Sequence, residues 1–174
     1  MADTWKERVG AWSGARNAVQ MLSLPEGGVM GLDTSHDCWH AAYSAFGRWR
    51  QKVAEVAGYA IWKVKYDDYP ATDTVMIDWG HLPENALMGD WPETPSDPLL
   101  VLIAHSDCEG IIRPEQGVPL ADRLEELLPE LEAVDATEGS VGHIEYHGGY
   151  AGAARKFIAG LRLAAAANED VDFH

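Results

Sequence analysis

Basic residues and cysteines are scarce in this sequence. Its 174 residues include 13 lysines and arginines against 28 aspartates and glutamates, so the formal net charge is −15 at pH 7. So much negative charge repels nucleic acids at long range, and we expect no direct nucleic-acid binding. The 2 cysteines lie in separate segments and are too few for the disulfide framework of a small secreted domain.

Long apolar segments are also missing. No apolar run approaches the ~20 residues that a membrane-spanning helix requires, and the N-terminus lacks the apolar core of a signal peptide. We therefore expect a soluble, cytoplasmic protein with reduced thiols and no membrane partner. What the sequence does contain is 47% hydrophobic residues, which is enough to bury one ordinary core.

The spacing of apolar residues divides the chain into two parts. Trp5, Val9 and Trp12 lie on one face of an expected helix, so we interpret residues 1–29 as an N-terminal helical extension. Residues 30–174 are then an α+β domain. Two tryptophans on one helical face must be covered, so either the rest of the chain packs on them or the extension joins copies into a homo-oligomer.

Periodicity within residues 30–174 predicts alternating short strands and helices. The unbroken apolar run at 98–104 is expected to be the central strand, because strands that are buried on both faces are apolar throughout. Pro119 should open a helix, and Pro129 should lie in its last turn. The other expected helices are 39–57 and 150–167, and the other expected strands are 29–33, 63–65, 74–79, 143–147 and 171–174.

These elements predict a single α+β layer domain. Its central mixed sheet of short strands would be packed by about four helices, of which the N-terminal extension is the first. Thr34 and Asp37 have the spacing of a capping box, and they should start the helix at 39–57. Residues 83–98 contain several prolines and are expected to form an irregular loop.

Two distant segments use the same four residue types. Residues 35–38 read SHDC and residues 105–108 read HSDC, and we interpret them as two sides of one shared site. A helix start near 35–39 would offer free backbone N–H groups to a small anionic ligand, while basic and aromatic side chains would offset its charge and stack on it. The predicted ligand-binding residues are His36, Asp37, Trp39, His40, Tyr43, Arg48, Lys52, His105 and Asp107.

Several of these residues have structural alternatives. Arg48 and Lys52 could belong to a solvated helix face that is paired with acidic neighbours, and the aromatic residues could belong to the core. Cys38 could be a nucleophile if its thiol pKa were lowered, although a small buried cysteine is the commoner role.

A divalent metal such as zinc is an alternative to the anionic ligand. His36 and His40 are spaced so that both imidazoles lie on one face of a helix. His105, Asp107 and Cys108 could complete a site that keeps an open position for a hydrolytic water. The ligand-binding interpretation needs no cofactor.

From Met30 onward, the sequence resembles an uncharacterised family of small proteins encoded by actinobacteria and by the phages that infect them. The residues that carry this resemblance are GLDTSHDCWHAAYSAFGRWRQKVAEVAG at 31–58, HSDCEG at 105–110, ADRLEELLP at 121–129 and EDVDFH at 169–174. The resemblance implies no catalytic residues. It does imply an accessory protein that acts in phage–host conflict, in the host cytoplasm if a phage encodes it.

Three functions remain open from the sequence. We expect a binding protein that sequesters a small anionic ligand, such as a nucleotide signal, as a counter-defence. One alternative is a metal-dependent hydrolase that uses the His/Asp/Cys cluster. The other is an acidic interaction protein whose surface mimics nucleic acid.

Overall fold

The computed structural model describes residues 31–60, 75–76, 81–140 and 142–174. The predictions for residues 1–29, including the extension as an oligomer interface, and for a strand at 63–65 lie outside these ranges. The α-helices in the described ranges are α2 (Tyr43–Val56), α3 (Leu99–Ala104), α4 (Pro114–Glu126), α5 (Leu128–Thr137), α6 (His143–Tyr146) and α7 (Gly149–Ala167).

The strands of the described ranges form three short pairs. The pairs are β1 (Leu32–Asp33) antiparallel to β2 (His40–Ala41), β3 (Tyr59–Ala60) parallel to β4 (Val75–Met76), and β5 (Gly110–Ile112) antiparallel to β6 (Val171–Phe173). A bridge between Thr34 and Phe173 joins the first pair to the third. The α+β class is therefore confirmed, but these separate pairs replace the expected central mixed sheet.

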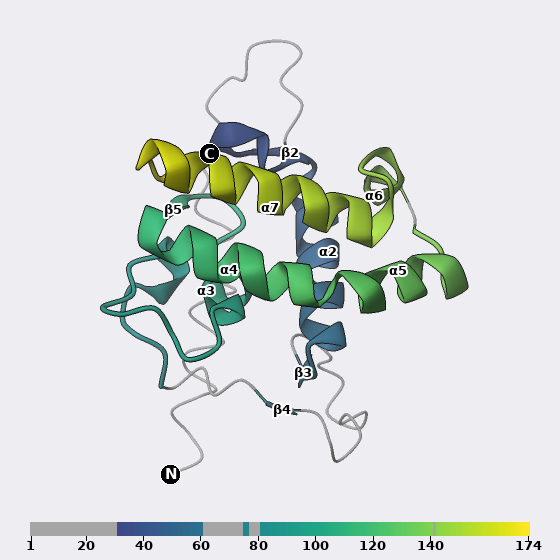
Figure 1. Ribbon diagram of the computed structural model, residues 1–174, viewed down its shortest axis with the longest axis horizontal. Helices are drawn as coiled ribbons and strands as arrows, with labels where there is room; N and C mark the ends of the chain where they lie inside the picture. The colour runs from purple at the N-terminus through teal and green to yellow at the C-terminus, as the bar shows by residue number, and fades with distance from the viewer. Residues whose placement is uncertain (1–30, 61–74, 77–80, 141) are drawn as a thin grey trace, which may run out of the picture.

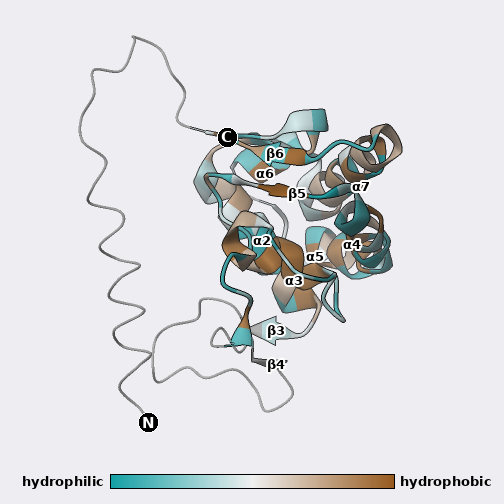
Figure 2. Ribbon diagram, turned by 90° about the vertical axis from the view of Figure 1, so that its left-hand side faces the viewer, coloured by the Kyte–Doolittle hydropathy of each residue, from teal (hydrophilic) through white to brown (hydrophobic). Residues whose placement is uncertain are grey.

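The helices pack in two layers. In Figure 1, α7 lies alongside α4, and α5 continues beyond the end of α4. Figure 2 shows α2 and α3 as the second layer, with β5 and β6 above them. The first layer is tight because Gly117 has no side chain: a Cβ there would lie 3.3 Å from the carbonyl oxygen of Leu161. Helix α7 contacts α4 and α5 in its own layer and α2 in the second layer, so it connects the two layers.

Aromatic side chains join α2, α7 and β6 in the core. Trp39, Phe46, Trp49 and Phe157 are fully buried. The rings of Trp39 and Trp49 stack with their centroids 5.3 Å apart, and those of Trp49 and Phe157 are 5.1 Å apart. Phe46 and Trp49 thus lie on the buried face that their spacing predicts, and the amphipathic helix around them is confirmed as α2.

The apolar run at 98–104 is helix α3, so the predicted central strand is wrong. Asp97 accepts a hydrogen bond from the backbone N–H of Leu99 at 3.0 Å, and Pro98 is the N-cap residue of this helix. All of α3 except the partly buried Leu100 is buried. A fully buried segment lacks periodicity, and therefore its apolar run fits a strand and a buried helix equally well. The Asp-Pro pair before the run is the feature that distinguishes them.

Several boundaries also differ from prediction. Helix α4 begins at Pro114, so Pro119 lies inside it rather than at its start, and Pro129 lies in the first turn of α5. The predicted strand at 143–147 is the short helix α6 instead. By contrast, the helix predicted at 150–167 and the strand predicted at 171–174 are confirmed as α7 and β6.

Residues 35–38 form a tight turn rather than the start of α2. Thr34 Oγ1 accepts a hydrogen bond from the backbone N–H of Trp39 at 2.7 Å, which closes the turn within itself. The chain then pairs β2 with β1, and α2 begins only at Tyr43. The predicted capping box of Thr34 and Asp37 is therefore wrong, because Thr34 caps this turn and not the helix.

The turn packs directly on α7 at Gly160. A Cβ at this position would overlap Cys38 Sγ, and it would lie 2.8 Å from the carbonyl oxygen of His36. One of these atoms belongs to the backbone and the other to a buried side chain, so neither can move aside and only glycine permits this contact.

We predict that Gly160→Ala lowers the free energy of unfolding by about 1–3 kcal/mol, the usual cost of overpacking a core. Gly47→Ala is the matched control, because Gly47 also lies within a helix but a Cβ there meets nothing within 4 Å. The control should raise stability by up to about 1 kcal/mol through helix propensity. Urea unfolding measures both, and equal effects of the two substitutions would contradict the close contact.

Candidate functional site

His36 and Asp37 occupy strained positions in the turn. Their φ angles are 57° and 55°, in the left-handed region that residues with a Cβ seldom adopt. This conformation sends the two side chains to different partners. His36 Nε2 lies 2.8 Å from Glu169 Oε2, and Asp37 Oδ1 lies 2.9 Å from Lys156 Nζ on α7.

Basic side chains gather around His147, the residue that follows α6. The pKa of His147 is lowered, first because burial desolvates its ring and then because Lys156, His40 and His143 place positive charge near it, while Asp37 acts in the opposite direction. These groups come from separate elements, since His40 is in β2, His143 in α6 and Lys156 in α7. We call these four basic residues, together with Asp37, the His147 cluster.

Trp39 contacts the His147 cluster through its ring. Its ring stacks on the ring of His147 with centroids 4.6 Å apart and planes inclined by 25°. Because Trp39 is also fully buried against Trp49 and Phe46, it is a core residue here rather than an exposed platform for a ligand. Its role at the site is to fix the plane of the His147 imidazole.

The other predicted ligand-binding residues, those on α2, are not among the groups that act on His147. Lys52 Nζ is 3.0 Å from carboxylate oxygens of both Glu55 and Glu138, so its charge is already balanced. Arg48 is exposed, and Tyr43 is partly buried against the core. The paired, solvated helix face that the sequence left open as an alternative thus describes Lys52.

His105, in the second segment, is a buried residue. It is 2% exposed, and its ring lies 4.0 Å from the ring of Phe173, centroid to centroid. Its two ring nitrogens face backbone oxygens, with Nδ1 2.8 Å from Ser106 O and Nε2 3.0 Å from Ile111 O. Burial nevertheless outweighs these bonds and lowers the pKa of His105.

Arg50 is a buried residue of this region that the sequence reading missed. It is 6% exposed, its Nη1 donates to the carbonyl oxygen of His105, and its guanidinium lies 5.3 Å from the centre of the Phe46 ring. Within the described part of the chain its Nε has no hydrogen-bond partner. Its position one turn after Phe46, on the apolar face of α2, is the sequence feature that predicts its burial.

The two segments have different polar partners, and the single shared site that the sequence suggested stays a prediction. Asp107 accepts a bond from Cys108 Sγ at 3.4 Å and acts on the charge of Arg50, whereas Asp37 pairs with Lys156. Both segments touch β6, because His105 packs on Phe173 and Thr34 bridges to it. The two segments therefore share β6 as a structural neighbour.

The described residues do not form the predicted metal site. Across residues 31–60, 81–140 and 142–174, no three His, Cys, Asp or Glu side chains come together as a group that could hold a metal ion. The predicted ligands His36, His40, His105, Asp107 and Cys108 are therefore dispersed. His36 and His40 face Glu169 and Asp33 respectively, because residues 35–41 are a turn and a strand rather than one helix.

Neither thiol is activated. Burial, followed by the charge of Asp37, raises the pKa of Cys38 to about 12. Desolvation and the neighbouring Asp107 also raise the pKa of the exposed Cys108. Because the thiolate is the reactive form, these environments favour inert cysteines.

No protein-family model, curated protein or solved structure matches the chain. Among the helices of the described residues, none combines the length and apolarity needed to cross a bilayer. The function must therefore be argued from the geometry of this chain.

We predict that the free energy of unfolding decreases as the pH falls below the ordinary imidazole pKa of about 6.5. Because burial lowers the pKa of folded His105, the unfolded chain binds the proton more readily and gains from acidification. Each proton taken up on unfolding contributes at most about 1.4 kcal/mol per pH unit.

Urea unfolding of the wild type and of His105→Gln at about pH 7 and about pH 5 measures this effect. The glutamine amide can still donate to the backbone oxygens, but it does not titrate. The wild type should lose more stability than the variant between the two pH values. Equal losses would show that His105 is not a buried neutral imidazole.

Proposed function

We propose that this protein binds and sequesters a small anionic ligand at the His147 cluster. The observation that supports this is that one lysine and two histidines from separate elements act electrostatically on His147, on a chain whose net charge is −15. Burial and positive charge disfavour the protonated form of His147, and a bound anion would offset that effect. This proposal keeps the predicted ligand class and places the ligand on the first segment alone.

The present partners of these cations are weak enough for a ligand to replace them. The Asp37 side chain in the Lys156 pair is 80% exposed, and the His40 side chain that faces Asp33 is 74% exposed. Ion pairs at such exposed positions contribute about 0–1 kcal/mol. A phosphate group, with more charge and more acceptor oxygens than one carboxylate, would therefore displace Asp37 at little cost.

His147 would make the site favour negatively charged ligands. Its ring is held flat on Trp39, and burial together with its basic neighbours disfavours its protonated form. A bound anion reverses this balance, because it stabilises the imidazolium and lies close to Lys156. Ligand binding should therefore be accompanied by proton uptake, which makes the affinity depend on pH.

The metal-dependent hydrolase has less support. Its predicted ligands are dispersed over the described residues, so no observation points to a metal-bound water. The thiol environments likewise favour no nucleophile.

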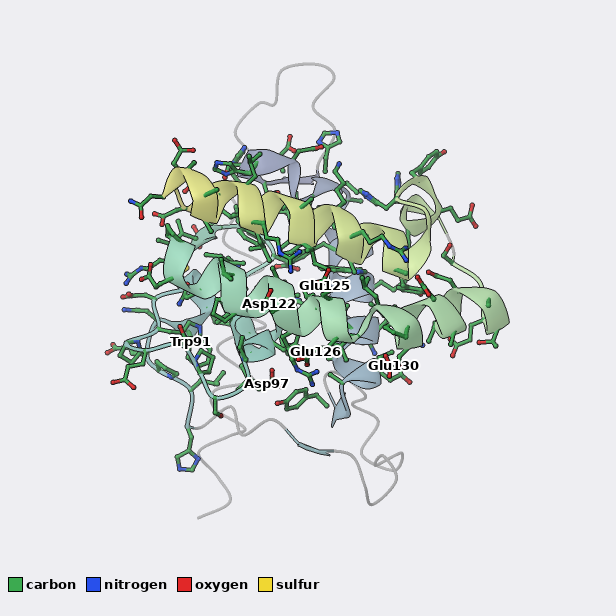
Figure 3. The ribbon with its side chains drawn as sticks, viewed as in Figure 1. Trp91, Asp97, Asp122, Glu125, Glu126 and Glu130 are labelled. Atoms are coloured by element: carbon green, nitrogen blue, oxygen red, sulfur yellow. The ribbon has the colours of Figure 1, made fainter. Side chains whose placement is uncertain are left out.

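Nucleic-acid mimicry also has less support than ligand binding. The acidic side chains labelled in Figure 3 along α4 and the start of α5 are Asp122, Glu125, Glu126 and Glu130. Arg162 pairs with Asp122 and Glu125, and Arg123 pairs with Glu126. Because the chain's own arginines neutralise much of this surface, it offers a basic partner less negative charge than the composition suggests.

In the phage–host setting that the resemblance implies, sequestration would act by lowering the free concentration of an anionic signal. Such a role requires affinity and abundance rather than catalysis. It fits a cluster that holds basic groups from separate elements near one another.

We predict that the full-length protein binds inorganic pyrophosphate at about pH 6, and at least about tenfold more weakly at about pH 8, because binding requires His147, whose pKa is lowered in the free protein, to take up a proton. Isothermal titration calorimetry measures both affinities. Lys156→Gln should weaken binding by about tenfold or more, which is the scale of one charge-assisted hydrogen bond.

Lys52→Gln is the matched control for this experiment, because Lys52 is also a half-buried lysine but pairs with Glu55 and Glu138 away from the cluster. It should leave the affinity unchanged. Pyrophosphate that fails to bind at the lower pH, or that binds equally well to the Lys156 and wild-type proteins, would refute the proposal.

A further inference from the structure

Ser35, His36 and Glu169 form a continuous chain of hydrogen bonds. Ser35 Oγ lies 3.0 Å from His36 Nδ1, and His36 Nε2 lies 2.8 Å from Glu169 Oε2. The serine and the histidine are adjacent in the turn, whereas the glutamate follows α7. The chain of bonds therefore joins two segments that are distant in the sequence, and it shares no side chain with the His147 cluster.

The carboxylate determines which nitrogen of His36 carries the proton. An ionised carboxylate only accepts hydrogen bonds, so Glu169 requires a proton on Nε2. In the neutral imidazole, Nδ1 then presents its lone pair to the hydroxyl of Ser35. This is the arrangement in which a histidine accepts the proton of a serine, with the acid as its orienting group.

The surrounding backbone holds these groups in place. Asn168 ends α7 in the left-handed conformation, with φ of 57°, and the N–H of Glu169 donates to the carbonyl oxygen of Ala164 at 3.0 Å. This C-terminal cap turns the chain so that Glu169 faces His36. On the other side, the left-handed φ of His36 persists because the turn packs on Gly160.

The backbone N–H of Asp172 donates to Ser35 Oγ at 2.9 Å. This bond holds the hydroxyl oxygen in place and leaves the hydroxyl proton available for an acceptor. The carbonyl oxygen of Asp170 is the competing acceptor for the hydroxyl proton, but at 3.3 Å it is farther away than His36 Nδ1.

We propose that Ser35 is an activated nucleophile that accepts an acyl group from small, uncharged esters, with His36 as its general base and Glu169 as the positioning residue for His36. This activity goes beyond ligand binding at the His147 cluster and does not depend on it. Ser35 is partly buried, and the His36 side chain is 14% exposed, so a small substrate reaches them from the surface. The segment that contacts Ser35 and His36 carries three acidic residues, Glu169, Asp170 and Asp172, so we expect it to disfavour anionic esters.

The reaction balances without a cofactor. A bond forms between Ser35 Oγ and the carbonyl carbon as the hydroxyl proton passes to His36 Nδ1. The bond from that carbon to the alcohol oxygen breaks, and the alcohol leaves with the proton. Water, deprotonated by the same imidazole, then releases the acid and restores the serine.

An uncharged alkyl fluorophosphonate tests the nucleophile directly, because Ser35 Oγ would bond to phosphorus as fluoride leaves. The full-length protein is incubated with the probe, and peptide mass spectrometry measures the rate of modification at each serine. We predict that Ser35 is modified at least about a hundredfold faster than the exposed Ser44 on α2, the scale of general-base catalysis.

His36→Gln keeps the serine but removes the base, so modification of Ser35 should fall to the rate of Ser44. Glu169→Gln should slow it, and Glu169→Asp, which keeps the carboxylate, should restore part of the rate. A thermal melt of each variant checks that it is folded. Modification of Ser35 no faster than of Ser44, or at an unchanged rate in a folded His36→Gln protein, would overturn the proposal.

Discussion

The contact between the 35–38 turn and Gly160 of α7 is the constraint on which the rest of this structure depends. It places backbone and sulfur atoms of the turn where a side chain on α7 would otherwise lie. From this contact, Asp37 reaches Lys156 in the middle of α7, and His36 reaches Glu169 beyond its end. The same turn then leads Trp39 into the aromatic core, where Trp49 and Phe157 continue the packing between α2 and α7.

The electrostatics of the molecule follow from this packing. Most of its excess negative charge lies on exposed carboxylates, and arginines of α4 and α7 pair with many of those on the helical face in Figure 3. Lys156, His40 and His143, from three separate elements, act instead on His147, whose ring stacks on the buried Trp39. Under the proposed function, a small anion would be attracted to this site although the molecule as a whole repels it, whereas a nucleic acid would meet the repulsion of the wider surface.

The sequence predicts the elements whose faces differ in polarity. The apolar stripe of α2 and the last helix are of this kind, and both are confirmed. Helix α3 is not, because a segment that is buried on all sides presents no polar face for its period to be recognised. Likewise, nothing local distinguishes His105 from a ligand-binding histidine, since the oxygens that enclose its ring belong to the backbone of residues that follow it.

The candidate site was predictable in part. The polar composition of residues 36–40 marks the turn, but Lys156 and His147 join it only through the packing of α7, which is a property of the tertiary fold. Arg50 is different, because its place one turn after Phe46 on the apolar face of α2 is visible in the sequence. Charged side chains are usually exposed, but Arg50 is buried. The carbonyl oxygen of His105 accepts a hydrogen bond from its guanidinium, which offsets part of the cost of burial.

The central claim is that separate elements bring His40, His143 and His147 to one anion site. Nuclear magnetic resonance of the imidazole protons during a titration with pyrophosphate tests it most directly. The account predicts that the resonances of these three histidines shift together with one dissociation constant, while those of the buried His105 stay in place. Shifts with unrelated dissociation constants, or shifts confined to histidines outside the cluster, would contradict it.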